Sequence, residues 1–374
     1  MTAPRADLLV VGGGVVGATA AWAAARHAPG ARILLADRGE PGGGASAHSA
    51  ALVVPYAPDA AHRALMGEAG RLLAAAPAAA FQRPAPMLFV TDRRDVATVA
   101  GRFLGAPLPL ADTDRLAELR AAYPDLRLRP DERVLDAGDR CTVFDVAGWI
   151  AAVLGGKLPG APAPEVLTGT AVTRLRPDGE GWAAETATGT VLRARRVLLA
   201  TGPWPAPDLA AGPRASRPAP AAKLVAALHL APGAVPDRPG TPGVVFLDDD
   251  LFVLPGRIPL VSFKARSPLA AGADPVAGLP GDERAEGVRA LARRLPELAR
   301  RVTGGRCFPD AYAPGRLPVV DRPAGPGGPV RITGGSGSGV RFAPALAERA
   351  VRLLGLAVPG PADRPSPAPS GASR

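Results

Sequence analysis

The sequence has few cysteines, few aromatic residues and no long apolar run, and each shortage excludes a class of protein. Its two cysteines, Cys141 and Cys307, are too few for a disulfide framework and fit a reducing compartment. They form no C-x-x-C pair, and the four histidines show no metal-ligand spacing, so we predict no metal site. No stretch of about 18 apolar residues occurs, which argues against a transmembrane helix. The N-terminus lacks the features of a signal peptide, so we expect a cytoplasmic protein with no membrane partner.

Lysine is also scarce, and this bears on whether the net charge of +10 indicates nucleic-acid binding. Only Lys157, Lys223 and Lys264 occur, so nearly all the positive charge is arginine, scattered without a run of five. A nucleic-acid-binding protein should cluster basic residues on one element beside exposed aromatics, and only 4% of this chain is aromatic. We therefore expect a small-molecule partner and no nucleic acid.

The chain does have the length and apolar content of a globular protein, and its start carries a clear pattern. At 374 residues and 47% hydrophobic, it predicts two domains or one enlarged α/β unit. A short apolar strand at 7–11 precedes a glycine turn, a helix of small residues follows at 18–27, and a second strand follows at 32–36. This order predicts one βαβ unit.

The glycine turn of this unit matches a dinucleotide-binding fingerprint. Gly12 permits the tight turn, Gly14 lets the backbone approach a pyrophosphate, and Gly17 allows the helix to pack closely on the strand. The phosphates would lie at the helix N-terminus, where free N–H groups favour negative charge. Asp37, 20 residues after Gly17, can accept hydrogen bonds from ribose hydroxyls. The fingerprint alone does not separate NAD from FAD.

Three further features favour FAD. A second glycine loop at 42–44 directly follows the second strand, so it can approach the cofactor from the other side. A later apolar strand stops at Gly202, and a last strand leads into a glycine cluster at 334–339 and a terminal helix. Such a helix can direct its N-terminus at the flavin pyrimidine and stabilise the reduced ring.

The elements alternate between two units along the chain. We predict an α/β fold in which a Rossmann-type FAD-binding domain (1–57, 146–204 and 328–356) carries an inserted β-rich substrate domain of mixed sheet and helices (58–145 and 205–327), with a disordered tail at 359–374. Further strands are expected at 84–90, 171–175, 182–186, 191–200, 224–230, 244–247, 251–254, 260–263 and 330–333, and helices at 59–80, 112–123, 146–154, 283–302 and about 344–356.

These pieces, in this order, resemble the D-amino-acid oxidase-like flavoproteins, which include glycine oxidase, sarcosine oxidase and D-arginine dehydrogenase. The resemblance extends from Asp7 to about Leu356. It implies an FAD-binding domain, a substrate domain built on a mixed sheet, and a main-chain contact from Val172 to adenine. The predicted cofactor-binding residues are Gly12, Gly14, Val15, Val16, Gly17, Asp37, Arg38, Gly44, Ala45, Ser46, Val172, Thr201, Gly202, Trp204, Gly335, Ser336, Gly337 and Gly339.

Two arginines are candidates for binding a substrate carboxylate. The resemblance implies this role for Arg306, and a planar guanidinium can hold a carboxylate through two parallel bonds. Arg341, just after the glycine cluster, matches a basic substrate-binding position of sarcosine oxidase-like members. Each also has a simpler interpretation, an ordinary salt bridge for Arg306 and a surface helix start for Arg341.

The chain departs from its relatives at several positions. Leu52 stands where D-arginine dehydrogenases carry a histidine, and Phe252 where they carry a substrate-binding tyrosine, so an apolar, cyclic or N-alkylated amino acid fits better than a cationic one. Leu260 replaces the oxygen-activating lysine of sarcosine oxidases, and Lys264 nearby is interpreted as a surface residue. Cys307 lies close to a cysteine that some relatives bond to FAD, so a covalent link is a minor alternative to a buried free thiol.

The predicted function is FAD-dependent oxidation of the C–N bond of an amino acid or secondary amine. A hydride passes to flavin N5 and an imine forms, with the protein supplying orientation and electrostatics. Three alternatives stay open: an NAD(P)-dependent dehydrogenase, a disulfide-reducing flavoenzyme, which would need a close cysteine pair, and a non-catalytic FAD-binding subunit. The substrate, its stereochemistry, the electron acceptor and the oligomeric state are open at this point.

Overall fold

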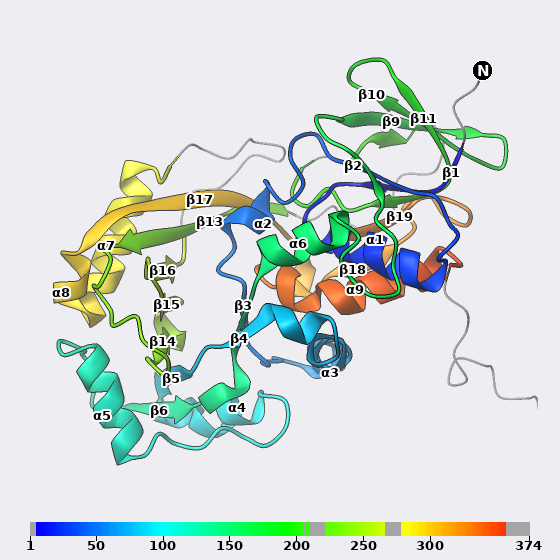
Figure 1. Cartoon of the computed structure of the whole chain (residues 1–374). Helices are drawn as coiled ribbons and strands as arrows, with labels where there is room; N and C mark the ends of the chain where they lie inside the picture. Colours follow the sequence, from blue (N-terminus) through cyan, green and yellow to red (C-terminus); the bar gives the residue numbers. More distant parts are fainter. Residues whose placement is uncertain (1–4, 205, 210–220, 266–277, 357–374) are drawn as a thin grey trace, which may run out of the picture.

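The computed structural model describes residues 5–204, 206–209, 221–265 and 278–356, and two large sheets organise them. Figure 1 shows the sheets at opposite ends of the molecule, with long strands of the second reaching toward the first. The tail at 359–374, predicted to be disordered, lies outside the described residues. Among the described helices, none is long and apolar enough to cross a bilayer.

The first sheet has nine strands around a parallel centre. Its main path runs β12-β9-β10-β11-β1-β2-β8, and β19 pairs with β11 and β18. Strands β1, β2, β8, β11 and β19 pair in parallel, as expected for βαβ units. The bounds are β1 Ala6–Val11, β2 Ile33–Ala36, β8 Glu165–Leu167, β9 Val172–Asp178, β10 Gly181–Thr186, β11 Val191–Leu199, β12 Asp208–Leu209, β18 Val319–Asp321 and β19 Val330–Thr333.

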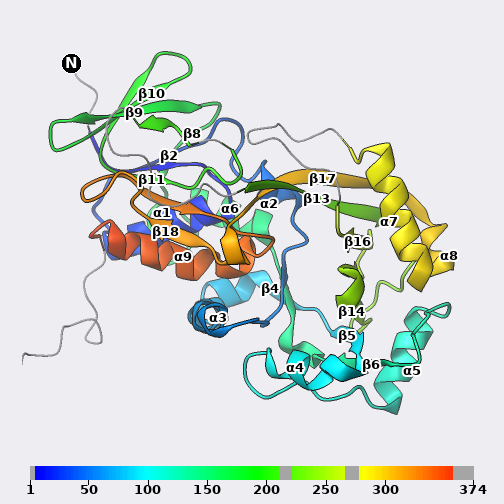
Figure 2. The same ribbon diagram turned by 180° about the vertical axis from the view of Figure 1, so that it is seen from behind.

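Both faces of strand β1 are covered, which explains its continuous apolar run. On one face Leu8 and Val10 pack with helices α1 (Val15–His27), α6 (Val146–Leu154) and α9 (Gly339–Leu353). On the other face Leu9 and Val11 pack against the antiparallel strands β9 and β10. Figure 2 shows α1 and α9 lying side by side under the sheet. The small side chains of α1 allow the two helices to pack closely.

The second sheet has seven strands in the order β17-β13-β16-β15-β14-β5-β6. One face packs on helices α5 (Thr113–Ala122), α7 (Gly281–Arg294) and α8 (Pro296–Ala299), which bury the even-numbered residues of β13. The opposite face carries Val225 and Ala227 and borders a cavity. The bounds are β5 Met87–Asp92, β6 Glu132–Asp136, β13 Ala221–Leu230, β14 Gly243–Phe246, β15 Leu251–Leu254, β16 Leu260–Phe263 and β17 Val302–Tyr312.

A small sheet and short helices connect the two large sheets. Strands β3 (Leu52–Val53), β4 (Gln82–Pro84) and β7 (Thr142–Phe144) form it, with α2 (Ala45–His48) before and α4 (Val96–Gly101) within this region. Helix α3 (Ala60–Ala74) buries Leu65 and Met66 in the core of the first sheet's helices, although the predicted boundary at residue 57 assigns it to the substrate domain. The division into domains stays a prediction.

One predicted helix is wrong in its second half. The sequence predicts a single helix over 283–302, but α7 ends at Arg294, α8 at Ala299, and β17 begins at Val302. The sequence does not predict β17 as a strand, because its glycines and its proline are residues that disfavour strand interiors. Strand β17 lies at the sheet edge, where Pro309 costs no ladder hydrogen bond. The terminal helix also begins earlier than expected, at Gly339.

Candidate functional site

A cavity of about 810 Å³ lies between the first sheet, the second sheet and α2. It is continuous from the glycine turn after β1 to the apolar face of the second sheet. This size and mixed lining are typical of a small-molecule site. Of the predicted cofactor residues, all except Gly17 line it, together with both candidate arginines.

The glycine turn has the geometry that the fingerprint predicts. Gly12 has a φ of 103°, and a Cβ there would lie 2.4 Å from the carbonyl oxygen of Ala200. A Cβ on Gly17 would lie 1.9 Å from the carbonyl oxygen of Gly12, so this glycine packs helix against strand. Gly14 precedes α1 and provides no side-chain cap. The helix N-terminus therefore borders the cavity, and no side chain at the Gly14 cap position occupies its main-chain N–H groups.

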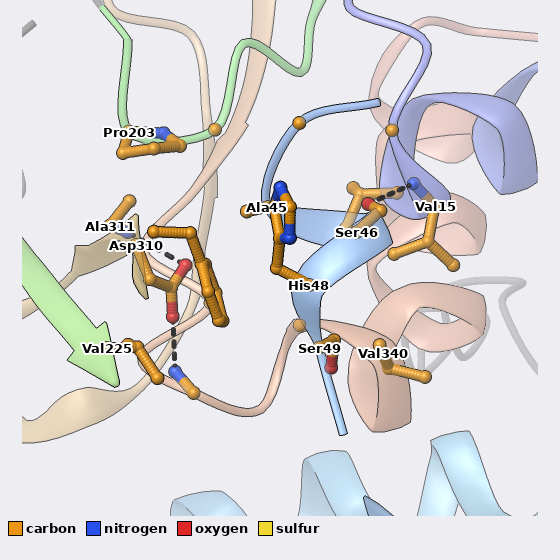
Figure 3. Close-up of a pocket in the computed structure, with 18 of the residues that line it drawn as sticks. Val15, Ala45, Ser46, His48, Ser49, Pro203, Val225, Asp310, Ala311 and Val340 are labelled. Carbon is orange, nitrogen blue, oxygen red and sulfur yellow. Dashed lines mark hydrogen bonds between the residues drawn. The ribbon is translucent and has the colours of Figure 1, made fainter. Parts of the chain in front are cut away.

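The second glycine loop is attached to this helix end. The Ser46 hydroxyl, on α2, accepts a hydrogen bond from the Val15 N–H at 2.9 Å, which is visible in Figure 3. Ser46 and Ala45, both predicted to bind the cofactor, border the cavity. The loop and the first turn of α1 thus form adjoining walls of one groove.

Asp37 and Trp204 shape the far end of the groove. The carboxylate of Asp37 accepts hydrogen bonds from the N–H groups of Gly13 at 2.7 Å and Gly39 at 2.9 Å, which leaves lone pairs for a ribose hydroxyl. The guanidinium of Arg38 lies 4.3 Å from the ring centre of Trp204. A Cβ on Gly44 would lie 3.0 Å from that indole, and the buried indole Nε1 has no hydrogen-bond partner within the described structure.

The glycine cluster before α9 forms another wall. Ser336 has a φ of 51°, and its hydroxyl accepts from the Ala313 N–H at 3.0 Å and donates to the Gly334 carbonyl at 3.0 Å. The Gly337 N–H donates to Asp310 at 2.6 Å. These contacts hold the cluster against β17, with Gly335, Gly337 and Gly339 on the cavity side.

These observations fit a dinucleotide such as FAD. Two glycines stand where any Cβ would clash, and the N-terminus of a helix borders the cavity. The carboxylate of Asp37 lines the cavity, and the buried indole Nε1 of Trp204 has no partner in the described structure. Val172, on β9, lies at the same end of the cavity as Asp37 and Thr170, consistent with the expected contact to adenine.

Arg306 lies on the cavity face of β17. Its Nη2 donates only one long hydrogen bond, 3.4 Å, to the Ser49 carbonyl, and its Nε is buried without a partner. No ion pair to it is found within the described ranges, so the salt-bridge interpretation does not hold there. Burial lowers the pKa of Arg306. Burial and the positive charge of Arg306 also lower the pKa values of His48 and His229.

Arg341 is in the first turn of α9 and is held by the main chain. Its Nη1 donates to the carbonyls of Val54 at 2.9 Å and Tyr56 at 3.3 Å. Burial lowers its pKa to about 10. This burial excludes the interpretation of Arg341 as a surface residue, and its position on the cavity wall keeps it a candidate for substrate binding.

The sequence-based prediction misses several cavity residues, including His48, Asp310 and Tyr312. His48, at the end of α2, stacks on Phe308 with ring centroids 5.7 Å apart. Asp310 and Tyr312 continue the cavity face of β17 after Arg306 and Phe308. Alternation along β17 would have identified this set, but the strand itself is not recognisable from the sequence.

The structure corrects the suggestion of a covalent link at Cys307. Its side chain packs in the core of the second sheet's helical face, where the thiol donates to the Gly278 carbonyl at 3.0 Å. Phe308 takes the cavity-facing position instead. The other cysteine, Cys141, is buried in a separate cluster, so the close cysteine pair of a disulfide-reducing flavoenzyme is missing.

Three positions that the sequence analysis expects to differ from relatives border the cavity. Leu52, Phe252 and Leu260 all line the cavity, and with Phe89 and Val245 they make its second-sheet end apolar. Lys264 does not line it. In the part of the chain that the structure describes, no cluster of His, Cys, Asp and Glu could hold a metal ion.

Known structures resemble nearly the whole chain at low sequence identity. L-proline dehydrogenase from P. horikoshii has a TM-score of 0.75 and 17% identity over 94% of this chain and 93% of its own. Glycine oxidase from Geobacillus kaustophilus has a TM-score of 0.75 and 16% identity over 95% and 96%. NikD, an unusual amino acid oxidase essential for nikkomycin biosynthesis, has a TM-score of 0.72 and 19% identity over 94% of each chain. At these identities the likeness shows the fold.

A search of curated proteins finds no match. The sequence does match the DAO family, described as FAD dependent oxidoreductase, over residues 7–353, which is nearly the whole chain. This match decides between the cofactors that the fingerprint left open, in favour of FAD over NAD(P). The chain therefore belongs to the DAO family of FAD-dependent oxidoreductases.

Proposed function

We propose that the protein oxidises the C–N bond of an amino acid or secondary amine. A hydride leaves the carbon that bears the nitrogen for flavin N5, and the imine product hydrolyses in water. FAD, when bound, supplies the two-electron acceptor for this chemistry. The side chains of the cavity then have to bind, orient and deprotonate the substrate.

The main support for an amino-acid substrate is the position of Arg306. It is a cation on the wall of a partly apolar cavity, with one long hydrogen bond and no acidic partner within the described structure. An uncompensated charge in such a place costs free energy unless a ligand pairs with it. The two neighbouring histidines have lowered pKa values, so they are neutral near pH 7 and leave Arg306 as the positive charge at this point. A substrate carboxylate is the natural partner.

Arg341 gives a second, weaker carboxylate site. Because its Nη1 is engaged by two carbonyls, fewer of its donors remain for a ligand than in Arg306. Its buried Nε has no partner in the described structure, which leaves one donor unused. We assign the main carboxylate contact to Arg306 and a supporting one to Arg341.

The apolar walls favour a substrate with an apolar or cyclic side chain. Leu52, Phe252 and Leu260 offer no charge to a cationic side chain. Of the similar structures, an L-proline dehydrogenase and a glycine oxidase are named for small or cyclic amino acids. These names support the proposed class and leave the individual substrate and its stereochemistry open.

An anaerobic absorbance titration tests the proposal. FAD-loaded protein is titrated with D-, L- and N-methyl amino acids and with amines lacking a carboxylate. The proposal expects the oxidised flavin band to bleach with at least one apolar or cyclic amino acid, and not with its decarboxylated counterpart. Readmission of air then distinguishes an oxidase from a dehydrogenase. A flavin that bleaches with dithionite but with no amino acid or amine would instead support the non-catalytic FAD-binding subunit.

A further inference from the structure

A carboxyl group lies on the cavity wall with no assigned role. Asp310 is on β17, four residues beyond Arg306, so alternation puts both side chains on the cavity face. Its two oxygens accept hydrogen bonds from the N–H groups of Gly337 at 2.6 Å and Ala311 at 2.8 Å. Figure 3 shows Asp310 on one wall of the cavity and His48, from α2, on another. The main chain therefore fixes the direction of this carboxyl group.

No cation pairs with Asp310 in the described structure. Lys223 faces it across the β13–β17 ladder, but the exposed ammonium lies 4.9 Å from the ring centre of Tyr312 and makes no ion pair with Asp310. Burial raises the pKa of Asp310, and its carboxylate charge in turn contributes to the raised pKa of Tyr312. Among the described residues, the other charged or titratable groups that line the cavity around this strand include Asp250, Arg316, His48, Arg306 and Arg341.

Oxidation of an amine requires a group that takes a proton from the substrate nitrogen, and the Asp310 carboxylate can do this. An amino acid arrives with its nitrogen as an ammonium, but a hydride leaves carbon readily only when the nitrogen has a free electron pair. A group within reach must therefore hold the nitrogen and take its proton. A partly desolvated carboxylate without a cation attracts an ammonium and is a stronger base than a solvated one.

We propose that Asp310 binds the ammonium group of the substrate and accepts its proton. An N–H bond breaks and an O–H bond forms on the Asp310 carboxylate, while the electron pair stays on nitrogen. No redox change occurs in this step. It prepares the hydride loss of the proposed function, on which this inference rests.

The spacing on β17 accommodates both ends of an amino acid. Four residues along a strand cover about 13 Å between Cα atoms, so the side chains of Arg306 and Asp310 can approach one ligand from the two ends of that interval. Phe308 lies between them, and its ring is backed by His48. A substrate with its carboxylate at Arg306 and its nitrogen toward Asp310 would lie along the strand, its α-carbon above Phe308.

The D310N variant tests the proposal through a pH profile. The rate constant of anaerobic flavin reduction is measured from pH 6 to pH 10 with an amino acid that reduces wild-type protein. We expect a loss of about 10²–10⁴-fold at pH 7, the usual contribution of a proton acceptor, with recovery as the pH approaches the pKa of the substrate's own ammonium group. The K223A variant, which removes the opposing charge on the same face, should keep the wild-type profile. A D310N profile that matches the wild type overturns the proposal.

Wild-type protein provides an independent measurement should D310N fail to retain FAD. If Asp310 takes the proton, the bound substrate is reactive well below the pKa of its free ammonium group, and the reduction rate stays constant down to the pKa of Asp310. A wild-type rate that follows the free ammonium group's ionisation overturns the proposal. If the proposed amine oxidation itself is wrong, the result differs from both of these outcomes, because then no amino acid or amine reduces the wild-type flavin at any pH.

Discussion

A Cβ atom on Gly17 would lie 1.9 Å from the carbonyl oxygen of Gly12, so the first helix and the turn before it pack at main-chain contact. The carbonyl oxygen of Ala200 is similarly close to Gly12, at 2.4 Å from a Cβ placed there. These contacts set the position of the α1 N-terminus relative to the cavity. We therefore predict that binding of the FAD diphosphate depends on these two positions, where no side chain fits.

The G17A variant should lose both stability and cofactor. The added methyl group must push α1 away from β1, and overpacking of this kind typically costs about 1–3 kcal/mol. The shift also displaces the N–H groups that face the diphosphate. Thermal unfolding and the ratio of FAD to protein absorbance measure both effects.

Gly70 supplies the matched control for this substitution. It lies inside helix α3, and a Cβ added there would have no neighbouring atom within 4 Å. The G70A variant should keep full FAD content and gain up to about 1 kcal/mol from helix propensity. If G17A behaves like G70A, the close packing of α1 on the glycine turn is not needed for cofactor binding.

Substitution of Arg306 should weaken substrate binding while FAD stays bound. An R306M variant removes charged hydrogen bonds of about 1.5–3 kcal/mol, which corresponds to roughly a 10–150-fold rise in the substrate concentration that half-saturates flavin reduction. R341M should have the smaller effect, because Arg341 is partly engaged by Val54 and Tyr56. Equal half-saturation in wild type and R306M would show that Arg306 does not hold the carboxylate.

A buried ion pair whose residues do not line the cavity connects helix α7 to the second sheet. Arg294 donates to Glu132 at 2.6 and 2.8 Å, and both side chains are almost fully buried. An E132Q variant leaves Asp249 as the acidic partner of the guanidinium, so the loss should stay below the ~3–5 kcal/mol of a fully uncompensated buried charge. Denaturant unfolding measures this loss, and flavin content at low denaturant should be unchanged.

The same pair predicts the direction of an acid effect on stability. Burial opposes ionisation of Glu132, but hydrogen bonds from Arg294 and the Arg129 N–H outweigh it and lower its pKa. A lowered pKa contributes stability above the ordinary glutamate value, and this stability is lost as the pH falls through the lowered pKa. The stability difference between wild type and E132Q should therefore shrink on acidification below about pH 4. A difference that is constant with pH would contradict this.

FAD should be released intact when the protein is denatured. The thiol of Cys307 lies on the helical face of the second sheet, and burial raises its pKa, so it is neither near the cavity nor readily ionised. Mass spectrometry of denatured protein should give the polypeptide mass alone, with free FAD in the supernatant. A polypeptide carrying an added flavin mass would restore the covalent alternative.

The sequence predicts the residues around the glycine turn better than those on β17, because the first depend on local patterns and the second on pairing between distant strands. The glycine turn, Asp37 and their strands lie within 37 consecutive residues, so local patterns describe them completely. Strand β17 pairs with β13 from a distant part of the chain. Its glycines and Pro309 have low strand propensity, so the local sequence does not predict a strand there. Arg306 is found only through the family resemblance, and Asp310 is missed, because without the strand nothing indicates that the two share a face.

The most direct test of the account is an anaerobic single turnover with product analysis. FAD-loaded protein is mixed with the amino acid that bleaches it, and the reduced flavin is compared with the carbonyl compound and ammonia or amine released. The account predicts one carbonyl product for each flavin reduced, and loss of both in R306M at low substrate concentration. Protein that binds FAD but keeps it oxidised with every amino acid and amine offered would contradict it.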